Sequence, residues 1–402
     1  MERDVSDFRW LVEGAASPYL DRVRAAGATS VALVQSLRRE LSAPRVHLIL
    51  EQYELRERAR VKFARADEMF FTRQLLEQAT DEWIARYKAH RTAGCPCWID
   101  LCCGLGGELV GRGPSGRVLG VDRDPVAVEL ARANGRVYGV AAKCLAADAA
   151  RVAVEEADGW HLDPDRRGTG RRVTHGDAFE PGNAVWDALW RRQPHGCIKL
   201  APATELNAAW CERSEREWIG SRRECRQQVV WCGRFAEAAG QHRATLVAQD
   251  GSWQSIVAPP DLPAPIGRRL GRYVFDPASV LGAAKLIGAV AATQQLEVLQ
   301  WEAGYVTGDH RCDCPFLTAF EVLEELPCDL RRLRTALRRR EIGQLEIKTR
   351  GVDLDPRNLL RDLRLGGPEK RTLLISGPDH QRRAILARRV ASQNARLACE
   401  PA

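Results

Sequence analysis

An aspartate followed by closely spaced glycines is the stretch of this sequence with the clearest capacity for chemistry. Residues 98–110 read WIDLCCGLGGELV, so Asp100 ends an apolar run and Gly104 and Gly106 precede a second one. Glycine has no Cβ, which lets the backbone turn sharply and lets a ligand approach closely. The pattern predicts a strand, a glycine-rich turn and a helix, a unit that commonly holds a nucleotide-like cofactor.

The spacing of the acidic residue and the glycines separates the cofactor classes. A nicotinamide site carries G-x-G-x-x-G, and its third glycine would fall at position 109, which is Leu109. The order D-x-x-x-G-x-G is instead typical of enzymes that use S-adenosylmethionine. Asp100, Gly104 and Gly106 match that order.

Two further aspartates follow the next predicted strands. VLGVDRDP places Asp122 at the end of the second strand, where a carboxylate can accept from both hydroxyls of a ribose. CLAADAA places Asp148 after the third strand, where it can meet the edge of an adenine. Ligands of open α/β sheets bind at the carboxyl ends of the strands, so the three acidic positions together predict an S-adenosylmethionine site.

An Asp-Pro pair follows the fourth predicted strand. Methyltransferases that act on planar amino groups often carry [Asp/Asn]-Pro-Pro-aromatic there, because the acidic side chain can hold the amine in line with the transferred methyl group. Asp163 and Pro164 match this motif, and Asp165 and Arg166 do not. We therefore expect Asp163 and Pro164 to be catalytic, with an ordinary Asp-Pro turn as the alternative.

Four arginines lie close together after this pair, around a Gly-Thr-Gly segment. Four like charges repel one another unless a partner is present, and the guanidinium group suits phosphate oxygens. We expect a substrate-binding loop formed by Arg166, Arg167, Arg171 and Arg172.

Hydrophobic periodicity indicates the elements that must position these residues. Residues 1–92 carry apolar side chains at helical spacing and are expected to form a helical region. From 93 to 240, short apolar runs alternate with helical segments, which predicts a mainly parallel α/β sheet with right-handed crossovers. Residues 241–326 are expected to form an irregular connector with a helix, and residues 327–402 a small basic α+β unit.

Composition restricts the class of protein. The chain has 402 residues, of which 45% are hydrophobic and 28% charged, as in ordinary globular proteins. No run reaches the ~18 apolar residues of a membrane span, and the charged first residues do not resemble a signal peptide. We expect a cytoplasmic protein whose 13 cysteines are mostly reduced. Cys95/Cys97 and Cys312/Cys314 have C-x-C spacing, which is not the usual zinc spacing, so no metal is expected.

The positive charge is concentrated near the end of the chain. Between Pro327 and Ser392 there are 17 Lys and Arg against 8 Asp and Glu, a balance of +9 in a chain of net charge +7. A predicted helix there carries two arginine clusters, and Arg338 and Arg339 in the second cluster are expected to contact substrate. Such a basic unit favours a polyanion such as RNA, although a solvated basic surface would have the same composition.

The chain resembles a family of bacterial class I methyltransferases that carry a THUMP-like domain at the C-terminus. The resemblance covers most of residues 65–376 and spans both domains in order. Its stretches are FFTRQLLEQAT (70–80), DLCCGLGGEL (100–109), VDRDP (121–125), LDPDRR (162–167), IKLAP (198–202), GRYVFDP (271–277), FEVLEELP (320–327), RRLRTALRRREIGQLEIKTRGVDLDP (331–356) and LRLGGPEKRTLLI (363–375).

The resemblance implies a Rossmann-like methyltransferase core followed by a module named for its likeness to THUMP, an RNA-binding domain of tRNA-modifying enzymes. In such relatives the residues that match Phe71 and Thr72 would close over the cofactor. The leading hypothesis is methylation of a base amine in tRNA or rRNA. A small-molecule or protein methyltransferase with a structural basic unit is the alternative, and a non-catalytic binding module is a third. His161 carries little weight, the role of Lys199 stays open, and the sequence does not indicate the oligomeric state.

Overall fold

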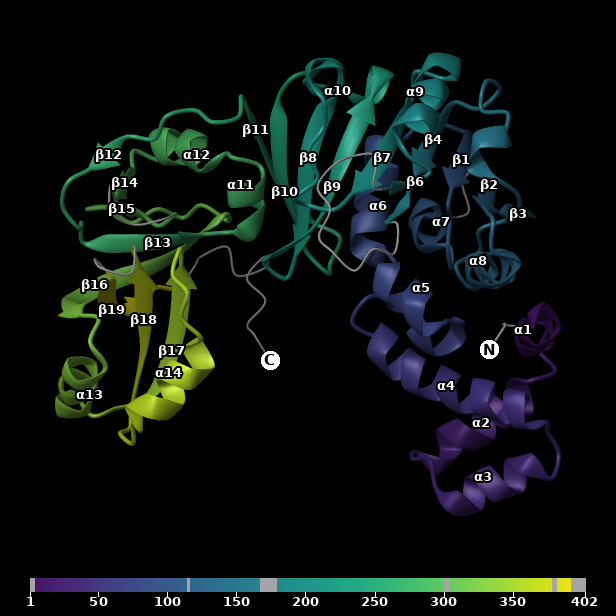
Figure 1. Cartoon of the computed structure of the whole chain (residues 1–402), viewed down its shortest axis with the longest axis horizontal. Helices are drawn as coiled ribbons and strands as arrows, with labels where there is room; N and C mark the ends of the chain where they lie inside the picture. Colours follow the sequence, from purple (N-terminus) through teal and green to yellow (C-terminus); the bar gives the residue numbers. More distant parts are fainter. Residues whose placement is uncertain (1–3, 114–115, 167–178, 300–303, 378–381, 392–402) are drawn as a thin grey trace. The chain divides into compact units, whose positions relative to one another are not determined.

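The computed structural model describes residues 4–113, 116–166, 179–299, 304–377 and 382–391 (Figure 1). The chain divides into two compact units. The first contains Met1–Arg216, Gln227–Ala239 and Gln249–Ser252. The second contains Glu217–Arg226, Gly240–Ala248 and Trp253–Ala402.

Helices make up the beginning of the first unit. They are α1 (Val5–Val12), α2 (Ser17–Ala26), α3 (Val31–Arg38), α4 (Ala43–Ala59), the 3₁₀ turn η1 (Ala66–Glu68), α5 (Arg73–Gln78) and α6 (Glu82–Arg91). Side-chain caps set where several of them begin, because Asp4, Ser30 and Thr72 each accept a hydrogen bond from a backbone N–H in the first turn. Their buried side chains share one core with Leu105 and Val126, which packs these helices against the region that follows.

A mainly parallel sheet forms the rest of the first unit. Its strands are β1 (Cys97–Leu101), β2 (Arg117–Asp122), β3 (Lys143–Ala146), β4 (Gly159–Leu162), β7 (Gly196–Leu200) and β9 (Glu224–Cys232). β1 pairs in parallel with β2 and β4, β2 with β3, and β4 with β7, whereas β9 is antiparallel to β7. The mainly parallel α/β sheet predicted from the sequence is therefore confirmed.

The connections and the strand order bring the carboxyl ends of several strands together. The connecting helices are α7 (Gly107–Arg112), α8 (Pro125–Val137), α9 (Asn183–Arg192) and α10 (Ala208–Arg213), with the 3₁₀ turns η2 (Ala149–Arg151) and η4 (Gly233–Phe235). The order β9-β7-β4-β1-β2-β3 places β1 between β4 and β2. Because these three strands are parallel, their carboxyl ends lie side by side at one edge of the sheet.

Three more strands extend this order, and a small ribbon follows β4. β8 (Glu215–Ser221), β10 (His242–Val247) and β11 (Trp253–Ala258) complete the nine-stranded order β11-β10-β8-β9-β7-β4-β1-β2-β3. β5 (Asp165–Arg166) pairs antiparallel with β6 (Phe179–Glu180) as a separate two-stranded sheet. The chain that leaves β4 therefore enters a short ribbon immediately after Pro164.

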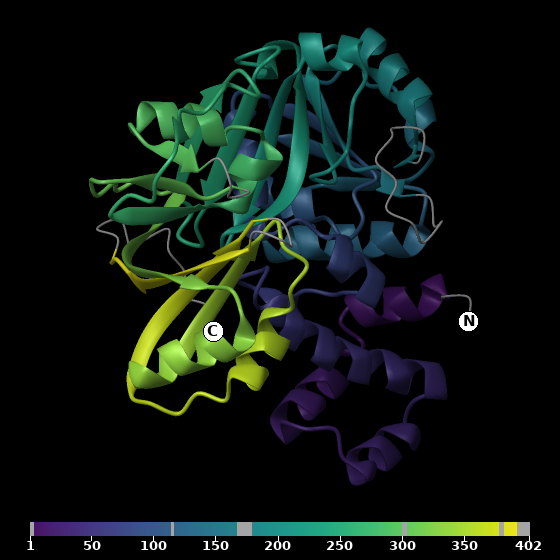
Figure 2. The same ribbon diagram turned by 60° about the vertical axis from the view of Figure 1, so that its left-hand side comes forward.

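A second sheet forms the main part of the second unit. Its order is β12-β14-β15-β13-β16-β19-β18-β17. The strands are β12 (Ile266–Gly267), β13 (Tyr273–Pro277), β14 (Glu297–Leu299), β15 (Val306–Gly308), β16 (Leu317–Pro327), β17 (Ile342–Arg350), β18 (Glu369–Ser376) and β19 (Arg383–Arg389). The helices α13 (Leu330–Arg339) and α14 (Pro356–Leu363) lie on one face of β16 to β19 (Figures 1 and 2). Leu333 and Leu337 of α13 and Leu363 of α14 are buried with Leu373 and Leu386 of the sheet.

The segment 241–326 differs from the irregular connector expected for it. It contains β10 to β16 together with two short helices, α11 (Ser279–Ala283) and α12 (Ile287–Thr293). The predicted single helix is interrupted because Lys285 adopts a left-handed φ of 57°. The strands β13 and β16 pair with one another and β16 pairs with β19, so distant partners stabilise short runs that show little periodicity of their own.

Two features of other protein classes are absent from the described ranges. No helix there is long and apolar enough to cross a membrane. The same ranges hold no group of three or more His, Cys, Asp and Glu side chains arranged for a metal ion. Each cysteine in the described part of the chain is a free thiol.

Candidate functional site

The turn between β1 and α7 has a left-handed backbone that its glycines make accessible. Cys102, Gly104 and Gly106 have φ angles of 60°, 53° and 86°. A Cβ at position 106 would lie 3.1 Å from the Cα of Ala131 on α8, whereas a Cβ at position 104 would lie 3.6 Å from the side chain of Leu75 on α5. Gly106 is thus required both by its backbone angle and by the close approach of α8.

Asp122, the last residue of β2, lies against this turn. Its Oδ2 accepts a hydrogen bond of 2.9 Å from the backbone N–H of Gly104, and its Oδ1 accepts one of 2.9 Å from the N–H of Asp124. Burial raises the pKa of this carboxyl, and the two backbone donors oppose that rise. A carboxylate oxygen can accept more than one hydrogen bond, so Asp122 still has acceptor capacity.

Asp100, near the end of β1, is 1% exposed. Its Oδ1 lies 2.7 Å from Nδ1 of His161 on the neighbouring strand β4. Its Oδ2 is buried and has no hydrogen-bond partner among the described residues. Burial raises the pKa of Asp100, and the hydrogen bond and charge of His161 act in the opposite direction. The turn therefore carries a buried acceptor that a donor has not satisfied.

Asp148 follows β3, beside β2 in the sheet. Its side chain is exposed and accepts a hydrogen bond of 3.0 Å from the N–H of Ala150, which caps η2. The segment before it is fixed to β2, because the N–H of Ala147 donates to the carbonyl oxygen of Asp122. Asp148 thus lies at the same edge of the sheet as Asp122 and is the most accessible of the three aspartates.

Two buried amides hold the segment that ends at Phe71 and Thr72, through its residues Phe70 and Phe71. Gln52 on α4 both donates to the carbonyl oxygen of Phe71, at 2.7 Å, and accepts from its N–H, at 2.9 Å. Asn134 on α8 donates to the carbonyl oxygens of Phe70, at 3.0 Å, and of Leu105 in the glycine turn, at 2.9 Å. The Phe71 ring is buried in the helical core, and the Thr72 hydroxyl caps α5. This segment therefore fixes the position of α5 beside the turn.

Asp163, immediately after β4, forms an ion pair with Lys199. Lys199 Nζ on β7 lies 2.6 Å from Asp163 Oδ2 and also donates to the carbonyl oxygen of Gln78, at 3.0 Å. Although burial opposes it, the charge of Asp163 raises the pKa of Lys199. The Gln78 side chain donates to Asp165. The end of α5 is thus tied to the segment after β4, where the side chain of Asp163 is 30% exposed and Pro164 is buried.

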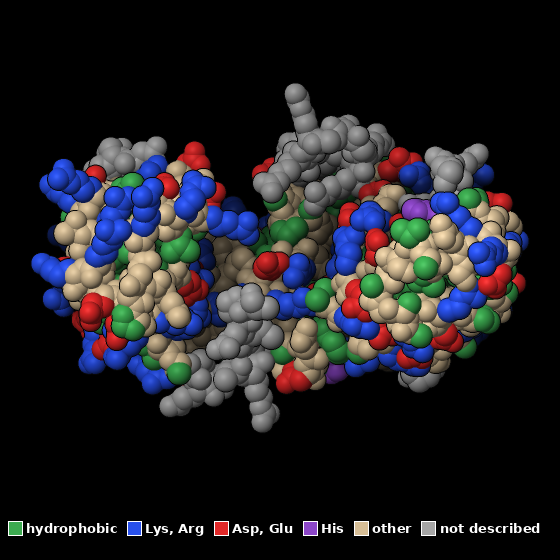
Figure 3. Space-filling model, turned by 90° about the horizontal axis from the view of Figure 1, so that it is seen from below, with side chains coloured by type: hydrophobic (Ala, Val, Ile, Leu, Met, Phe, Trp, Pro, Cys, Tyr) green, Lys and Arg blue, Asp and Glu red, His purple; other side chains and the backbone are tan. Residues whose placement is uncertain are grey.

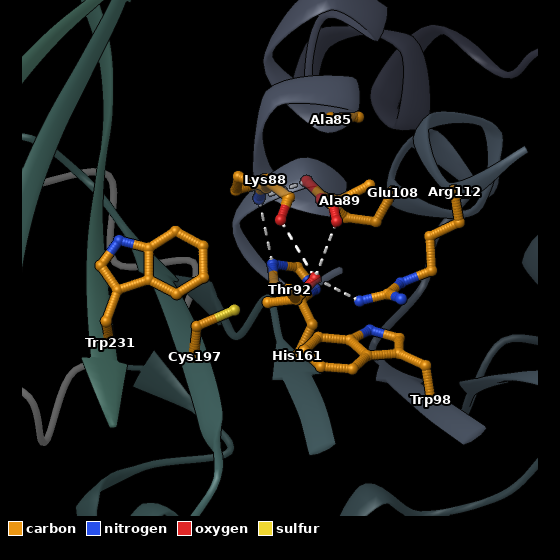
Figure 4. A pocket seen from close by; sticks show the side chains of 10 residues that line it. All are labelled: Ala85, Lys88, Ala89, Thr92, Trp98, Glu108, Arg112, His161, Cys197 and Trp231. Atoms are coloured by element: carbon orange, nitrogen blue, oxygen red, sulfur yellow. Dashed lines mark hydrogen bonds and ion pairs between the residues drawn. The ribbon is translucent and has the colours of Figure 1, made fainter. Parts of the chain in front are cut away.

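A chain of buried polar groups continues from His161, the partner of Asp100, to α6 and α7 (Figure 4). Lys88 Nζ on α6 lies 3.3 Å from Nε2 of His161 and 2.5 Å from Oε1 of Glu108 on α7. Burial would raise the pKa of Glu108, but the charges of Lys88 and His161 lower it to about 2. These groups border a cavity of about 10 Å³, the size of one water molecule. The network sets the orientation of Asp100 through His161.

Hydrogen-bond acceptors therefore gather around the left-handed turn, at the carboxyl ends of the strands. The carboxylates of Asp100 and Asp122 lie on adjacent strands, and Asp163 follows the strand on the other side of β1. Such an edge can accept hydrogen bonds from ammonium, amine and hydroxyl groups of a ligand.

Comparisons with known proteins identify the family. Two curated relatives, uncharacterized S-adenosylmethionine-dependent methyltransferases from two strains of Mycobacterium tuberculosis, are each 32% identical to the chain over 309 residues, which is 76% of this chain and 84% of the relative. The chain belongs to the S-adenosylmethionine-dependent methyltransferases. The THUMP domain-like family matches residues 317–389, from β16 to β19.

A solved structure supports the fold of this methyltransferase. The crystal structure of a proposed methyltransferase from Porphyromonas gingivalis W83 superimposes with a TM-score of 0.75 at 18% identity. The match covers 97% of this chain and 100% of the other. The resemblance predicted from the sequence, to a methyltransferase with a C-terminal THUMP-like domain, is confirmed, as is S-adenosylmethionine as the cofactor of the family.

The arginines expected to bind substrate in this methyltransferase fall into two groups. Arg167, Arg171 and Arg172 lie outside the described residues, and the backbone of Arg166 pairs with Phe179 in the small ribbon.

On α13 the arginines differ in what they contact. Arg338 donates to the carbonyl oxygen of Arg364, at 2.9 Å, which ties α13 to the end of α14. Arg339 instead lines a surface hollow together with Arg331 and Arg332. Arg338 and Arg339 are thus both exposed, but they lie beside different neighbours.

Several side chains at the site were not predicted as functional from the sequence. They are Lys88, Glu108 and Gln78, together with Lys199 and His161, whose roles the sequence left open or weighed lightly. Glu108 lies two residues after Gly106, so its proximity to the turn was a usable signal. The position of Lys88 had no such signal, because helical periodicity does not indicate which strand a helix contacts.

Proposed function

We propose that this methyltransferase binds S-adenosylmethionine at the carboxyl ends of β1, β2 and β3. The observation that carries the proposal is the left-handed turn from Cys102 to Gly106, which lies between the carboxylates of Asp100 and Asp122. A turn of this kind leaves backbone groups accessible to a ligand. The adjacent carboxylates supply the acceptors that a ribose and an amino-acid group require.

The residues at this edge fit the chemistry of that cofactor. When bound, S-adenosylmethionine supplies a methyl group activated by its attachment to a sulfonium. Asp122 would accept from the ribose hydroxyls, and Asp148 would meet the adenine edge. The buried Oδ2 of Asp100 has no donor in the described chain, so it can accept from the ammonium group directly or through a water.

The residues before α5 would complete the cofactor site. Phe71 is fully buried, so it would act by holding the backbone of this segment against Gln52 rather than by a contact of its ring. Thr72 begins α5, whose Leu75 side chain lies beside Gly104. The segment would thereby cover one side of the turn.

Asp163 and Pro164 would orient the group that receives the methyl. The carboxylate of Asp163 is partly exposed at the end of β4, and its ion pair with Lys199 fixes one of its oxygens. A carboxylate held in this way can accept from an amine and align its lone pair with the transferred methyl group. Lys199 would then be a positioning residue for Asp163.

RNA is the substrate class that we propose, with a base amine of tRNA or rRNA as the acceptor. The match to the THUMP domain-like family supports this, and so does the charge of the second unit. Figure 3 shows Lys and Arg side chains gathered over the part of the second unit that carries α13 and α14. Arg331, Arg332 and Arg339 line a hollow there, where guanidinium groups could meet phosphates. Arg166, Arg167, Arg171 and Arg172 are proposed to contact phosphates near the reacting base.

The test is methyl transfer from labelled S-adenosylmethionine to RNA from cells that lack the protein. We expect label in tRNA or rRNA and one modified nucleoside by mass spectrometry, with loss of the label in the Asp163→Ala variant. Label that enters only the protein or small-molecule fraction would contradict RNA as the substrate. Calorimetry with S-adenosylmethionine alone tests the cofactor site separately from the substrate.

A further inference from the structure

The hairpin turn between β8 and β9 has an unusual pair of residues. The two-residue turn consists of Arg222 and Arg223, with φ angles of 49° and 66°. Positive φ at both positions is the type I′ conformation, for which Asn-Gly is strongly preferred because other residues are strained there. A strained backbone conformation that a substitution to Asn-Gly would relieve is a feature of functional positions.

The guanidinium groups of this turn carry buried donors that have no partner in the described part of the chain. Nε and Nη2 of Arg222 and Nη2 of Arg223 are buried and have no hydrogen-bond partner within the described ranges. The turn itself is anchored, because the hydroxyl of Ser279 donates to the carbonyl oxygen of Arg223 at 2.8 Å. A buried donor without a partner raises the free energy of the folded protein. A ligand that accepts hydrogen bonds from these donors would remove that cost and so bind more tightly.

Other cations lie around Arg223 in the second unit. Burial lowers the pKa of Arg223; the charge of Asp276 raises it, and those of Arg389 and Arg350 lower it further. Lys348 and Arg350 lie on the same face of β17, two residues apart, because side chains alternate along a strand.

The carboxylates nearby are already paired. Asp276 is 2.7 Å from Arg350 and 3.0 Å from Lys348, and Glu346 is 2.8 Å from Arg389. Four cationic side chains, those of Arg223, Lys348, Arg350 and Arg389, therefore lie around two carboxylates that are already paired. The cluster therefore has an excess of positive charge and unpaired donors, and both favour the binding of an anion.

We propose that Arg222 and Arg223, together with Arg350 and Arg389, form a binding site for a phosphate group. Guanidinium groups bind tetrahedral oxyanions through paired N–H donors, and several of them compensate a dianion. The site goes beyond the proposed methyl transfer and is separate from the α13 hollow. Its phosphate comes either from free phosphate or from the backbone of a bound RNA.

The test uses the full-length protein and inorganic phosphate as the probe. The wild type should bind phosphate saturably by calorimetry, and Arg222→Asn/Arg223→Gly should weaken binding about tenfold or more, because two charged donors are lost. The matched control is Arg268→Asn/Arg269→Gly, the same change at two exposed arginines of the same unit, which should bind like the wild type. Without phosphate, the Asn-Gly turn variant should melt at or above the wild-type temperature, because its turn is no longer strained.

Several results would overturn the site. They are absence of phosphate binding in the wild type, equal binding in the wild type and the turn variant, and a turn variant that is less stable than the wild type without phosphate. Competition distinguishes the two sources of phosphate. If RNA displaces inorganic phosphate from the wild type and equally from the Arg268→Asn/Arg269→Gly control, the ligand is an RNA backbone, whereas phosphate that RNA leaves in place identifies the free anion. Either result supports the site.

Discussion

Charged side chains form both the turn after β1 and the exposed face of α13, but the two regions hold them differently. At the turn, Asp100 is 1% exposed and hydrogen-bonded to His161, and Asp122 accepts from two backbone N–H groups. On α13, Arg331 and Arg339 project from an exposed face beside a hollow.

This difference predicts two kinds of response to mutation. A buried carboxylate with fixed partners has one geometry, so each residue at the turn should be individually required. Exposed arginines are screened by solvent and act through their summed charge, so their loss should be graded. Four predictions test this contrast.

Gly106→Val should have the largest effect and abolish measurable binding of S-adenosylmethionine by calorimetry. The new Cβ would lie 3.1 Å from Ala131 Cα at a φ of 86°, and overpacking of this kind typically costs ~1–3 kcal/mol in addition to the backbone strain. Gly139→Val is the control, because its φ is 71° and a Cβ there meets nothing within 4 Å. Wild-type affinity in Gly106→Val would show that the turn is not the binding site.

Asp163→Ala should reduce turnover by about 100-fold, as expected when the reacting group is misaligned. The affinity for S-adenosylmethionine should stay within a few-fold, because the lost interaction is specific to the reacting geometry. Asp165→Ala, which removes an exposed carboxylate two residues further on, is the control. Steady-state kinetics with the RNA identified as the methyl acceptor measures the difference between the two variants. Normal turnover in Asp163→Ala would exclude the orienting role.

Asp122→Ala should weaken S-adenosylmethionine binding about tenfold or more, because a lost charged acceptor costs ~1.5–3 kcal/mol. Asp148→Ala should weaken it less, since the Asp148 side chain is exposed and water can replace it. Calorimetry of the two variants side by side measures the difference. A larger loss in Asp148→Ala would reverse the ranking that burial predicts.

Arg331→Ala/Arg339→Ala should have the smallest effect, a few-fold weaker binding of structured RNA. The log–log slope of affinity against salt should become less steep by ~0.7–0.9 for each phosphate contact removed. Arg334→Ala/Arg340→Ala removes the same charge from arginines that bond within the protein, to Asp362 and Glu324. Filter binding at several salt concentrations should leave the slope of this control closer to the wild type. Equal flattening in both variants would mean that net charge, not the α13 hollow, governs binding.

Sequence patterns predicted the local features of this methyltransferase well. They predicted poorly the features that depend on contacts between residues far apart in the chain. The parallel sheet, the turn with Gly104 and Gly106 and the position of Asp122 follow from short-range spacing, because a strand, a turn and a helix must follow one another in fixed order. The segment 241–326 was predicted as irregular because its strands are stabilised by partners far along the chain. Lys199, whose role stayed open in the sequence, is defined by its contact with Asp163 across 36 positions.

The sequence by itself determined the cofactor class, because the residues that define it lie close together in the chain. Asp100, Gly104 and Gly106 belong to one turn, and Asp122 ends the next strand. Only the tertiary structure decided which groups surround them. Lys88 contacts His161 from 73 positions away, and the contact exists because α6 lines one cavity together with Trp98 of β1 and His161 of β4. Likewise, Arg222 and Arg223 read as an ordinary charged pair until the hairpin places both at positive φ with buried donors. Such contacts depend on how the elements pack, and no local spacing encodes that packing.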